Sequence, residues 1–199
     1  MAKKAGTKGD KRIQKTKMCL KHALLGLLET KPFEKIKVTE ICDLACTGRV
    51  TFYTYYDDKY DLLKDCFEDI RQEIKDRYLE KRRQKNGEDA SSFQSCMLDF
   101  IDAQLETTES YDQQGYYLLE SPDLMLMYYN FSKDYLKEFE HSIRDRYSLK
   151  YDQEQINSFF ILGFYGFIHA KHNIDSKELY RQCHELAGDL LNSSIFEEP

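Results

Sequence analysis

The stretch KVTEICDLACTGRVTFYTYYDDKYDLL, residues 37–63, decides the fold of this chain. It predicts a short helix that begins near Val38 or Thr39 and ends near Cys46, a turn at Gly48, and a second short helix over residues 49–56. Two short helices joined by a glycine-containing turn are typical of the helix-turn-helix motif. In that motif the second helix enters the major groove of DNA.

Apolar residues at helical spacing predict further helices on both sides of this stretch. A first helix is expected from Lys11 to about Thr30, where Pro32 stops it. Asp57 and Asp58 supply the cap and first-turn negative charge of a long helix that runs to about Lys85. The remaining helices are expected over residues 89–107, 122–147, 152–171 and 176–192. We therefore expect an all-α fold of about nine helices.

Charge is divided unevenly along the 199 residues, although the net charge is −6. Residues 1–60 hold 13 Lys and Arg against 7 Asp and Glu, whereas residues 61–199 hold 16 against 28. DNA phosphates attract the first segment and repel the second. We therefore expect a DNA-binding domain over residues 1–66 and a larger helical domain over residues 67–199. Residues 1–10 are expected to form a flexible basic arm, either solvated or inserted into a minor groove.

The second short helix carries side chains that suit contacts to DNA. The Arg49 guanidinium group matches guanine O6 and N7, and a phosphate contact is an equal alternative. Thr51 suits either bases or phosphates. The side chains expected to donate to phosphate oxygens are Tyr53, Tyr55 and Lys59.

Four other side chains of the stretch are assigned to the core. Phe52 and Tyr56 lie four residues apart and share a helix face that differs from the face of Tyr53. Cys42 and Cys46 lie one helical turn apart, but no nearby histidine or acidic pair completes a metal site with them.

The same residues resemble the helix-turn-helix of the tetracycline-repressor (TetR/AcrR) family of transcription regulators. The positions that carry the resemblance are Ile41, Ala45, Arg49, Thr51-Phe52-Tyr53, Tyr55-Tyr56, Lys59 and Leu62-Leu63. With Ala23, Leu27 and Phe33, the resemblance covers about residues 11–66. Beyond residue 66 only the helical layout is similar.

The resemblance implies a role for individual positions. Thr39 caps the first short helix near the DNA backbone. The residues that face the groove are Arg49, Val50 and Thr51, and those that hold phosphates are Tyr53, Tyr55 and Lys59. We add Thr47, in the turn, to this DNA-binding set. The chain departs from the family at Cys46, where glycine is usual, at Thr47, where an aliphatic residue is usual, and at Gly48, where serine or asparagine often caps the second helix.

The resemblance also implies a function. The chain is expected to be a ligand-responsive repressor that binds double-stranded, palindromic operator DNA as a homodimer. Residues 67–199 would then bind an unknown small-molecule effector and form the dimer. The alternative is a co-activator of the same fold, or a regulator that acts through a partner protein.

Two sets of residues in the second domain are candidates for these tasks. Aromatic and methionine side chains suit an amphipathic ligand and equally suit a core, and the pocket set comprises Phe93, Met97, Phe100, Tyr117, Met125, Tyr128 and Tyr135. The stretch 159–168 is apolar all round, which favours burial by a second chain over ordinary core packing. The dimer set comprises Phe160, Gly163, Phe164, Phe167, Leu186 and Leu190.

Other functions lack a motif in this sequence. It contains no GxSxG, HExxH, phosphate loop or dinucleotide fingerprint, so we expect no enzyme, no catalytic residue and no cofactor. No metal site is expected, although His169, His172 and His184 could approach one another. The six scattered cysteines suggest free thiols in a reducing cytoplasm, and the longest apolar stretch is too short to anchor the chain in a membrane.

Overall fold

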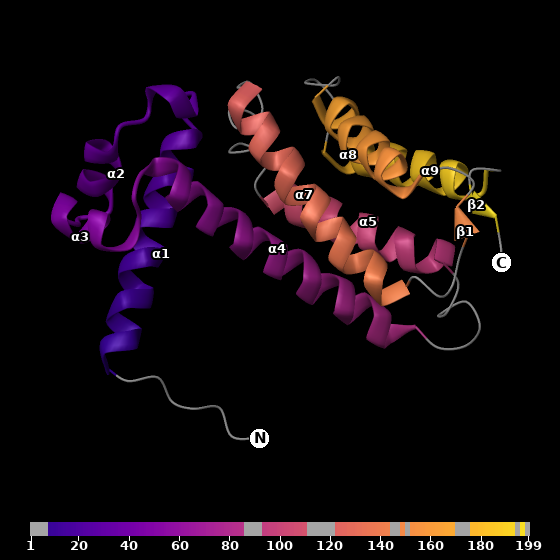
Figure 1. Cartoon of the computed structure of the whole chain (residues 1–199), viewed down its shortest axis with the longest axis horizontal. Helices are drawn as coiled ribbons and strands as arrows, with labels where there is room; N and C mark the ends of the chain where they lie inside the picture. Colours follow the sequence, from indigo (N-terminus) through magenta and orange to yellow (C-terminus); the bar gives the residue numbers. More distant parts are fainter. Residues whose placement is uncertain are drawn as a thin grey trace. The chain divides into compact units, whose positions relative to one another are not determined.

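The computed structural model describes residues 8–85, 93–110, 122–143, 148–149, 152–169, 176–193 and 196–197. These residues contain eight α-helices, against the nine or so expected, and the all-α class is confirmed. The chain divides by its contacts into a first unit that ends at Asp69 and a second unit that begins at Ile70. Helix α4 (Lys59–Gln84) belongs to both units (Figure 1).

The first unit holds the predicted helix-turn-helix. Its elements are α1 (Lys8–Leu28), the short 3₁₀ helix η1 (Phe33–Lys35), α2 (Val38–Leu44), α3 (Arg49–Tyr55) and the first turns of α4. Helix α1 begins three residues earlier than expected, so Lys8–Asp10 are helical and not part of a flexible arm. The acidic Asp10 stabilises this first turn because it lies at the positive end of the helix dipole. The rest of the predicted arm lies outside the described residues.

The predicted cap of α4 is confirmed at Asp58. Its Oδ1 accepts hydrogen bonds from the backbone N–H groups of Tyr60, at 2.8 Å, and Asp61, at 2.9 Å. These two bonds satisfy donors that have no partner inside the helix. The helix therefore begins at a fixed residue directly after α3.

One carboxylate joins three segments of the first unit. Asp65 of α4 accepts a 2.6 Å hydrogen bond from the Tyr56 hydroxyl group and pairs with Lys17 and Lys21 of α1, at 3.2 and 3.6 Å. Burial works against ionisation, but the hydrogen bonds from Tyr56 and Lys17 hold the pKa of Asp65 below its usual value. Lys21 also pairs with Asp69. The end of α3 is thereby tied to both α1 and α4.

The second unit is a helical bundle. Its elements are the rest of α4, α5 (Phe93–Ser110), α7 (Pro122–Ile143), α8 (Gln153–His169) and α9 (Ser176–Leu191). Helix α5 packs on α9, and α7 packs on α8. A two-residue antiparallel pair, β1 (Ser148–Leu149) with β2 (Phe196–Glu197), was not expected from the sequence. Ile74, Phe100, Tyr135, Cys183 and Leu191 bring four of the five helices into one core.

A buried acid fixes α5 against α4 in this unit. Asp99 is 4% exposed and accepts hydrogen bonds from Arg82 Nη1, at 2.8 Å, and from Lys85 Nζ, at 2.6 Å. Two cations compensate the single buried charge, which is the condition under which such a group is tolerated in a protein interior. No helix in the described part of the chain is long and apolar enough to cross a membrane.

We predict that Tyr56→Phe lowers the free energy of unfolding by about 1–2 kcal/mol at neutral pH, because a hydrogen bond to a charged, partly exposed carboxylate is lost. The pKa of Asp65 is lowered in the folded chain, so its stabilising contribution is present above the unfolded pKa and is lost as pH falls through the folded pKa. The difference between variant and wild type should therefore shrink below about pH 4, as measured by urea titration at several pH values.

Tyr53→Phe is the matched control for this measurement. Tyr53 is 57% exposed, and its hydroxyl group has no partner among the described residues. Its loss should leave the unfolding free energy unchanged. Equal destabilisation by the two variants would show that the Tyr56 hydroxyl group has no special role.

Candidate DNA-binding surface

The turn between α2 and α3 is closed by backbone hydrogen bonds. The N–H of Thr47 donates to Cys42 O at 2.9 Å, and the N–H of Cys46 donates to Asp43 O at 3.1 Å. This pair of bonds is a Schellman motif, which requires a left-handed residue at the position of Cys46. Cys46 has a φ of 50°, the only positive value among the described non-glycine residues. The chain thus keeps the turn with a cysteine where glycine is usual.

Gly48 serves as a helix cap and not as a left-handed turn residue. It is the N-cap of α3, with φ −70° and ψ 147°, and no side chain caps the helix there. A Cβ atom added at Gly48 would meet nothing within 4 Å. Glycine is therefore not required at this position, and the helix begins on a weak cap.

Helix α3 is anchored by one face and presents the opposite face to solvent. Phe52 is fully buried and Tyr56, directly after the helix, is 3% exposed, so their predicted core role is confirmed. Val50 is 85% exposed and Tyr53 is 57% exposed, and Arg49 is exposed beside them. The structure therefore brings three of the predicted DNA-binding residues onto one outward surface.

The other predicted residues lie around this surface. Thr51 and Tyr55 are half-buried at its sides. Thr47 is half-buried, and its hydroxyl group donates to Ala45 O at 3.1 Å. Thr39 is exposed but is not the cap of α2, because Lys37 occupies the N-cap position and Glu40 Oε2 accepts the Lys37 N–H at 2.9 Å. The hydroxyl group of Thr39 has no partner among the described residues.

Lys59 has a structural role that differs from the predicted phosphate contact. Its Nζ donates to three backbone carbonyls, those of Phe33 at 2.8 Å, Ile36 at 2.9 Å and Glu34 at 3.2 Å. An ammonium group has three N–H donors, so all of them are committed inside the unit. Burial lowers the pKa of Lys59, and the ring of Phe33 lies 4.5 Å from Nζ. Lys59 therefore holds η1 against α4 and is left out of the proposed interface.

The sequence prediction missed Thr54, which lies one turn after Val50 on the outward face and is exposed. Its position four residues from Val50 is the signal that would have identified it. The prediction was also wrong for Cys46, which is exposed, whereas the core role of Cys42 is confirmed. Burial raises the pKa of the Cys42 thiol and raises that of Cys66 to about 12, so these buried thiols are poor nucleophiles.

Most described residues of the predicted effector pocket are packed together. Phe100 and Tyr135 are 3% and 8% exposed, and their ring centroids lie 5.4 Å apart. Met97 packs against the same core, and the Tyr128 hydroxyl group accepts a hydrogen bond from Gln104 at 3.3 Å. Met125 is half-buried. Tyr117 and the side chain of Phe93 lie outside the described residues.

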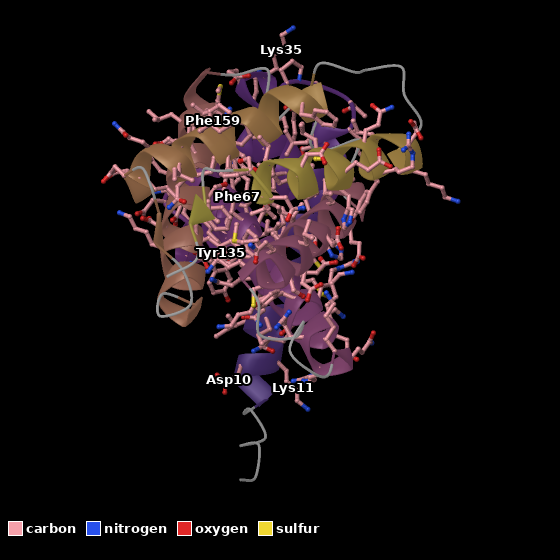
Figure 2. The ribbon with its side chains drawn as sticks, turned by 90° about the vertical axis from the view of Figure 1, so that its right-hand side faces the viewer. Asp10, Lys11, Lys35, Phe67, Tyr135 and Phe159 are labelled. Atoms are coloured by element: carbon pink, nitrogen blue, oxygen red, sulfur yellow. The ribbon has the colours of Figure 1, made fainter. Side chains whose placement is uncertain are left out.

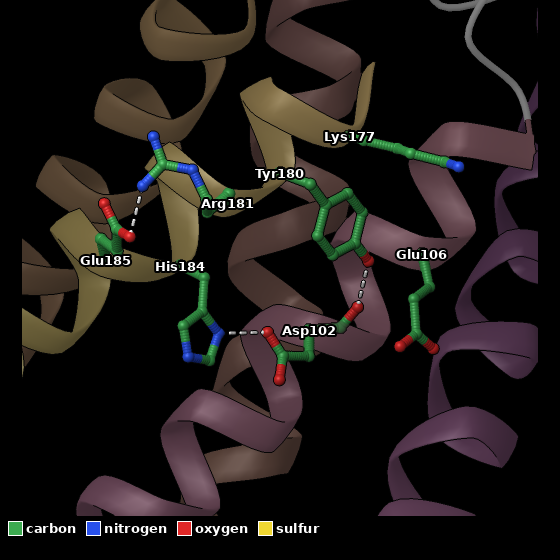
Figure 3. Close-up of a pocket in the computed structure, with 7 residues that line it drawn as sticks. All are labelled: Asp102, Glu106, Lys177, Tyr180, Arg181, His184 and Glu185. Atoms are coloured by element: carbon green, nitrogen blue, oxygen red, sulfur yellow. Dashed lines mark hydrogen bonds and ion pairs between the residues drawn. The ribbon is translucent and has the colours of Figure 1, made fainter. Parts of the chain in front are cut away.

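A hollow of about 490 Å³ lies instead between α5 and α9 (Figure 3). It is open to solvent and is lined mainly by charged side chains. Asp102 Oδ1 lies 2.6 Å from His184 Nδ1, and the Tyr180 hydroxyl group donates to Asp102 O at 2.7 Å. Arg181 lies between Glu178 and Glu185, at 2.7 and 2.5 Å. Most of these polar groups are thus paired with one another, and the hollow differs from the aromatic and methionine-lined pocket expected from the sequence.

The predicted dimer residues fall into two groups. Gly163 and Leu186 are exposed, whereas Phe160, Phe167 and Leu190 are half-buried. The side chain of Phe164 lies outside the described residues. Phe159 and Leu162 of α8, which were not in the predicted set, are 62% and 43% exposed. Phe159 is labelled in Figure 2.

We predict that Cys46→Gly raises the free energy of unfolding of the chain by about 0.5–1 kcal/mol. A non-glycine residue in the left-handed region costs about 1–2 kcal/mol, and the greater flexibility of unfolded glycine offsets part of the gain. Cys46→Ala is the control, because it removes the thiol but keeps the Cβ atom. Denaturant titration that shows equal stabilisation by Ala and Gly would contradict the conformational explanation.

Comparison with known proteins gives one sequence relative and several structural ones. No protein-family model matches the chain. A segment of 53 residues is 36% identical to an uncharacterized HTH-type transcriptional regulator, YxbF, of Bacillus subtilis, and it spans 27% of this chain and 14% of that protein.

The solved structures extend the likeness to most of the chain. A TetR transcriptional regulator from Streptococcus agalactiae superposes with a TM-score of 0.58 and 22% identity, over 90% of this chain and 97% of that one. A TetR family transcription regulator from Marinobacter aquaeolei gives 0.57 and 14%, over 90% and 97%. The dihydroxyacetone kinase operon activator DhaS gives 0.58 and 16%, over 92% and 98%. The resemblance predicted from residues 11–66 is therefore confirmed at the level of the fold, because this chain has the fold of the TetR-family transcription regulators.

Proposed function

We propose that this chain is a transcription regulator that binds operator DNA by placing α3 in the major groove. The observation that carries the proposal is the outward face of α3, where Arg49, Val50 and Tyr53 are exposed around a buried Phe52 anchor. The excess of basic residues in residues 1–60 favours phosphate contacts around that face. Arg49 suits a base edge, and the Tyr53 hydroxyl group suits a phosphate.

We also propose that the regulator is a homodimer that reads a palindromic operator. One seven-residue helix buries too little surface for typical specific affinities of roughly 10⁻⁸ M, so a second copy is needed. The exposed residues Phe159, Leu162, Gly163 and Gly166 lie along a single face of α8. An apolar stripe of this spacing suits the packing of two helices.

We propose further that a mostly apolar effector binds among α5 and α7 and releases the DNA, which makes the regulator a repressor. Because Phe100, Tyr135 and Met97 are packed together in the core, such a ligand must separate these side chains. A conformation in which this core is already open would bind the ligand more tightly than the packed one, because the ligand need not separate the side chains. This difference in ligand affinity is what allows the ligand to shift the balance between the two conformations.

The second candidate is an activator of the same fold. The likeness to DhaS, which is named an operon activator, supports this second candidate. The two functions share the surface on α3 and differ in the effect of DNA binding on transcription. A reporter gene measured with and without the regulator separates them, since an activator raises expression and a repressor lowers it.

Variants of α3 test the DNA-binding proposal. We predict that Arg49→Ala blurs sequence preference and costs about 1–3 kcal/mol at one base pair of each half-site, because a bidentate base contact is lost. Tyr53→Phe should instead weaken binding to all sequences alike, since it removes a phosphate contact. Genomic footprinting of the full-length chain, followed by titration of the operators found, measures both. Loss of sequence preference in Tyr53→Phe would contradict the assigned roles.

Substitution of α8 glycines tests the dimer. A Cβ atom at Gly163 or Gly166 meets nothing within 4 Å in the single chain, so Gly163→Gln and Gly166→Gln should fold normally. We predict that both variants dissociate the dimer and lose operator binding together. Asp134→Gln, an exposed change on α7, is the control and should remain dimeric. Sedimentation that shows a wild-type monomer at micromolar concentration would refute the dimer.

Reciprocity tests the effector proposal. Footprinting with and without candidate ligands identifies a ligand that releases the DNA. By linkage, operator DNA must then weaken ligand binding by the same factor, roughly 5- to 150-fold for typical couplings. Calorimetric titration of the ligand with and without operator measures that factor. Equal ligand affinity in the two titrations would remove the claim of allosteric control.

A further inference from the structure

The outward face of α3 is apolar at its centre. Val50 is 85% exposed, more than any other large apolar side chain of the described residues. Phe52, two residues later, is fully buried and anchors α3 in the core. Nothing in the fold therefore requires an apolar side chain at Val50. A β-branched residue is also a poor choice for an exposed helix position, because its χ1 rotamers are restricted.

Thr54 extends this apolar centre by one helical turn. Its hydroxyl group donates to Val50 O at 2.9 Å, so its one O–H donor is committed to the backbone. Residues four apart on a helix have Cβ atoms about 5–6 Å apart. Val50 and Thr54 therefore lie next to each other on one exposed face of α3, and we call their methyl groups the methyl strip.

The charged and polar neighbours of the methyl strip identify its partner as DNA. Arg49 precedes Val50 and is exposed on the same surface, and Tyr53 presents its hydroxyl group beside it. An apolar protein partner would need a wider patch, since stable interfaces bury roughly 1,200–2,000 Å² in total. In the major groove, by contrast, the apolar feature is small and single, because only thymine carries a C5-methyl group.

We propose that the methyl strip of Val50 and Thr54 reads thymine methyl groups in each half-site of the operator. This inference rests on the proposed DNA binding and adds the chemical feature that is read. Arg49 and Val50 are adjacent in sequence, so the thymine lies within a step or two of the base pair that Arg49 contacts. The discrimination arises because thymine buries a methyl group on Val50, whereas other bases leave the apolar surface against polar edges.

The test replaces thymine by deoxyuridine, which has the same Watson–Crick face and lacks only the methyl group. The operator is first selected from random DNA with the full-length chain, and each thymine is then replaced singly and in both half-sites. Burial of one methyl group is worth about fourfold in affinity, so we expect roughly a fourfold loss at one half-site and about 15-fold at both. The loss should be confined to one or two positions per half-site.

Variants assign the effect to the methyl strip. Val50→Ala keeps the helix and should bind thymine and deoxyuridine operators equally at the position that the wild type distinguishes. Thr54→Ser keeps the hydroxyl group and removes only the methyl, so it should reduce discrimination at a neighbouring position. Tyr53→Phe is the matched control, because it should weaken binding while leaving the thymine-to-deoxyuridine ratio at the wild-type value.

The outcomes separate this inference from the function on which it rests. If selection yields no preferred sequence, the proposed DNA-binding function fails, and binding of a protein to α3 becomes the better account of the exposed Val50. If an operator is found but every thymine replacement is neutral, or Val50→Ala keeps the wild-type ratio, DNA binding stands and the methyl reading is overturned.

Discussion

The Asp65 carboxylate is the contact on which the candidate DNA-binding surface depends. Helix α3 has seven residues and is too short to be stable alone, so its position must come from tertiary contacts. Phe52 supplies the apolar contact, and Tyr56 supplies the polar one through its 2.6 Å hydrogen bond to Asp65. Lys17 and Lys21 then fix the same carboxylate to α1. The exposed side chains of α3 are held in place by groups on the opposite side of the helix.

The turn before α3 shows how an unusual sequence can keep a common geometry. Cys46 adopts the left-handed conformation that glycine would adopt without strain, and Gly48 leaves the next helix without a side-chain cap. The left-handed cysteine costs about 1–2 kcal/mol, and glycine at the cap costs about a few tenths of a kcal/mol. The Schellman hydrogen bonds and the buried Phe52 must outweigh that cost. The helix-turn-helix geometry is therefore kept, and the motif could be predicted although its three turn residues depart from the family pattern.

The sequence predicted what depends on local pattern and missed what depends on distant contacts. The bounds of α2 and α3 were correct to within two residues, and Phe52 was separated from Tyr53 because helical periodicity assigns them to different faces. The structural role of Lys59 could not be predicted, because its carbonyl partners lie more than 20 residues earlier in the chain. Phe100 and Tyr135 suit a core and a pocket equally by composition, and their burial and 5.4 Å ring contact place them in the core.

Helix α4 carries the groups that hold the helix-turn-helix together, and this restricts how the proposed effector would act on the proposed DNA binding. Lys59 binds the carbonyls around η1, Asp65 binds Tyr56, and Asp69 pairs with α1. The same helix continues into the second unit, where Arg82 of the helix and Lys85, directly after its end, bind Asp99 of α5. The proposed ligand would therefore act on a helix, α5, that is bonded to α4, and α4 is bonded through Asp65 to Tyr56 at the end of α3. For ligand binding to be coupled to DNA binding through α4, the side chains packed around this helix must have two distinct arrangements. A continuous deformation would not suffice, because a close-packed core resists small shifts.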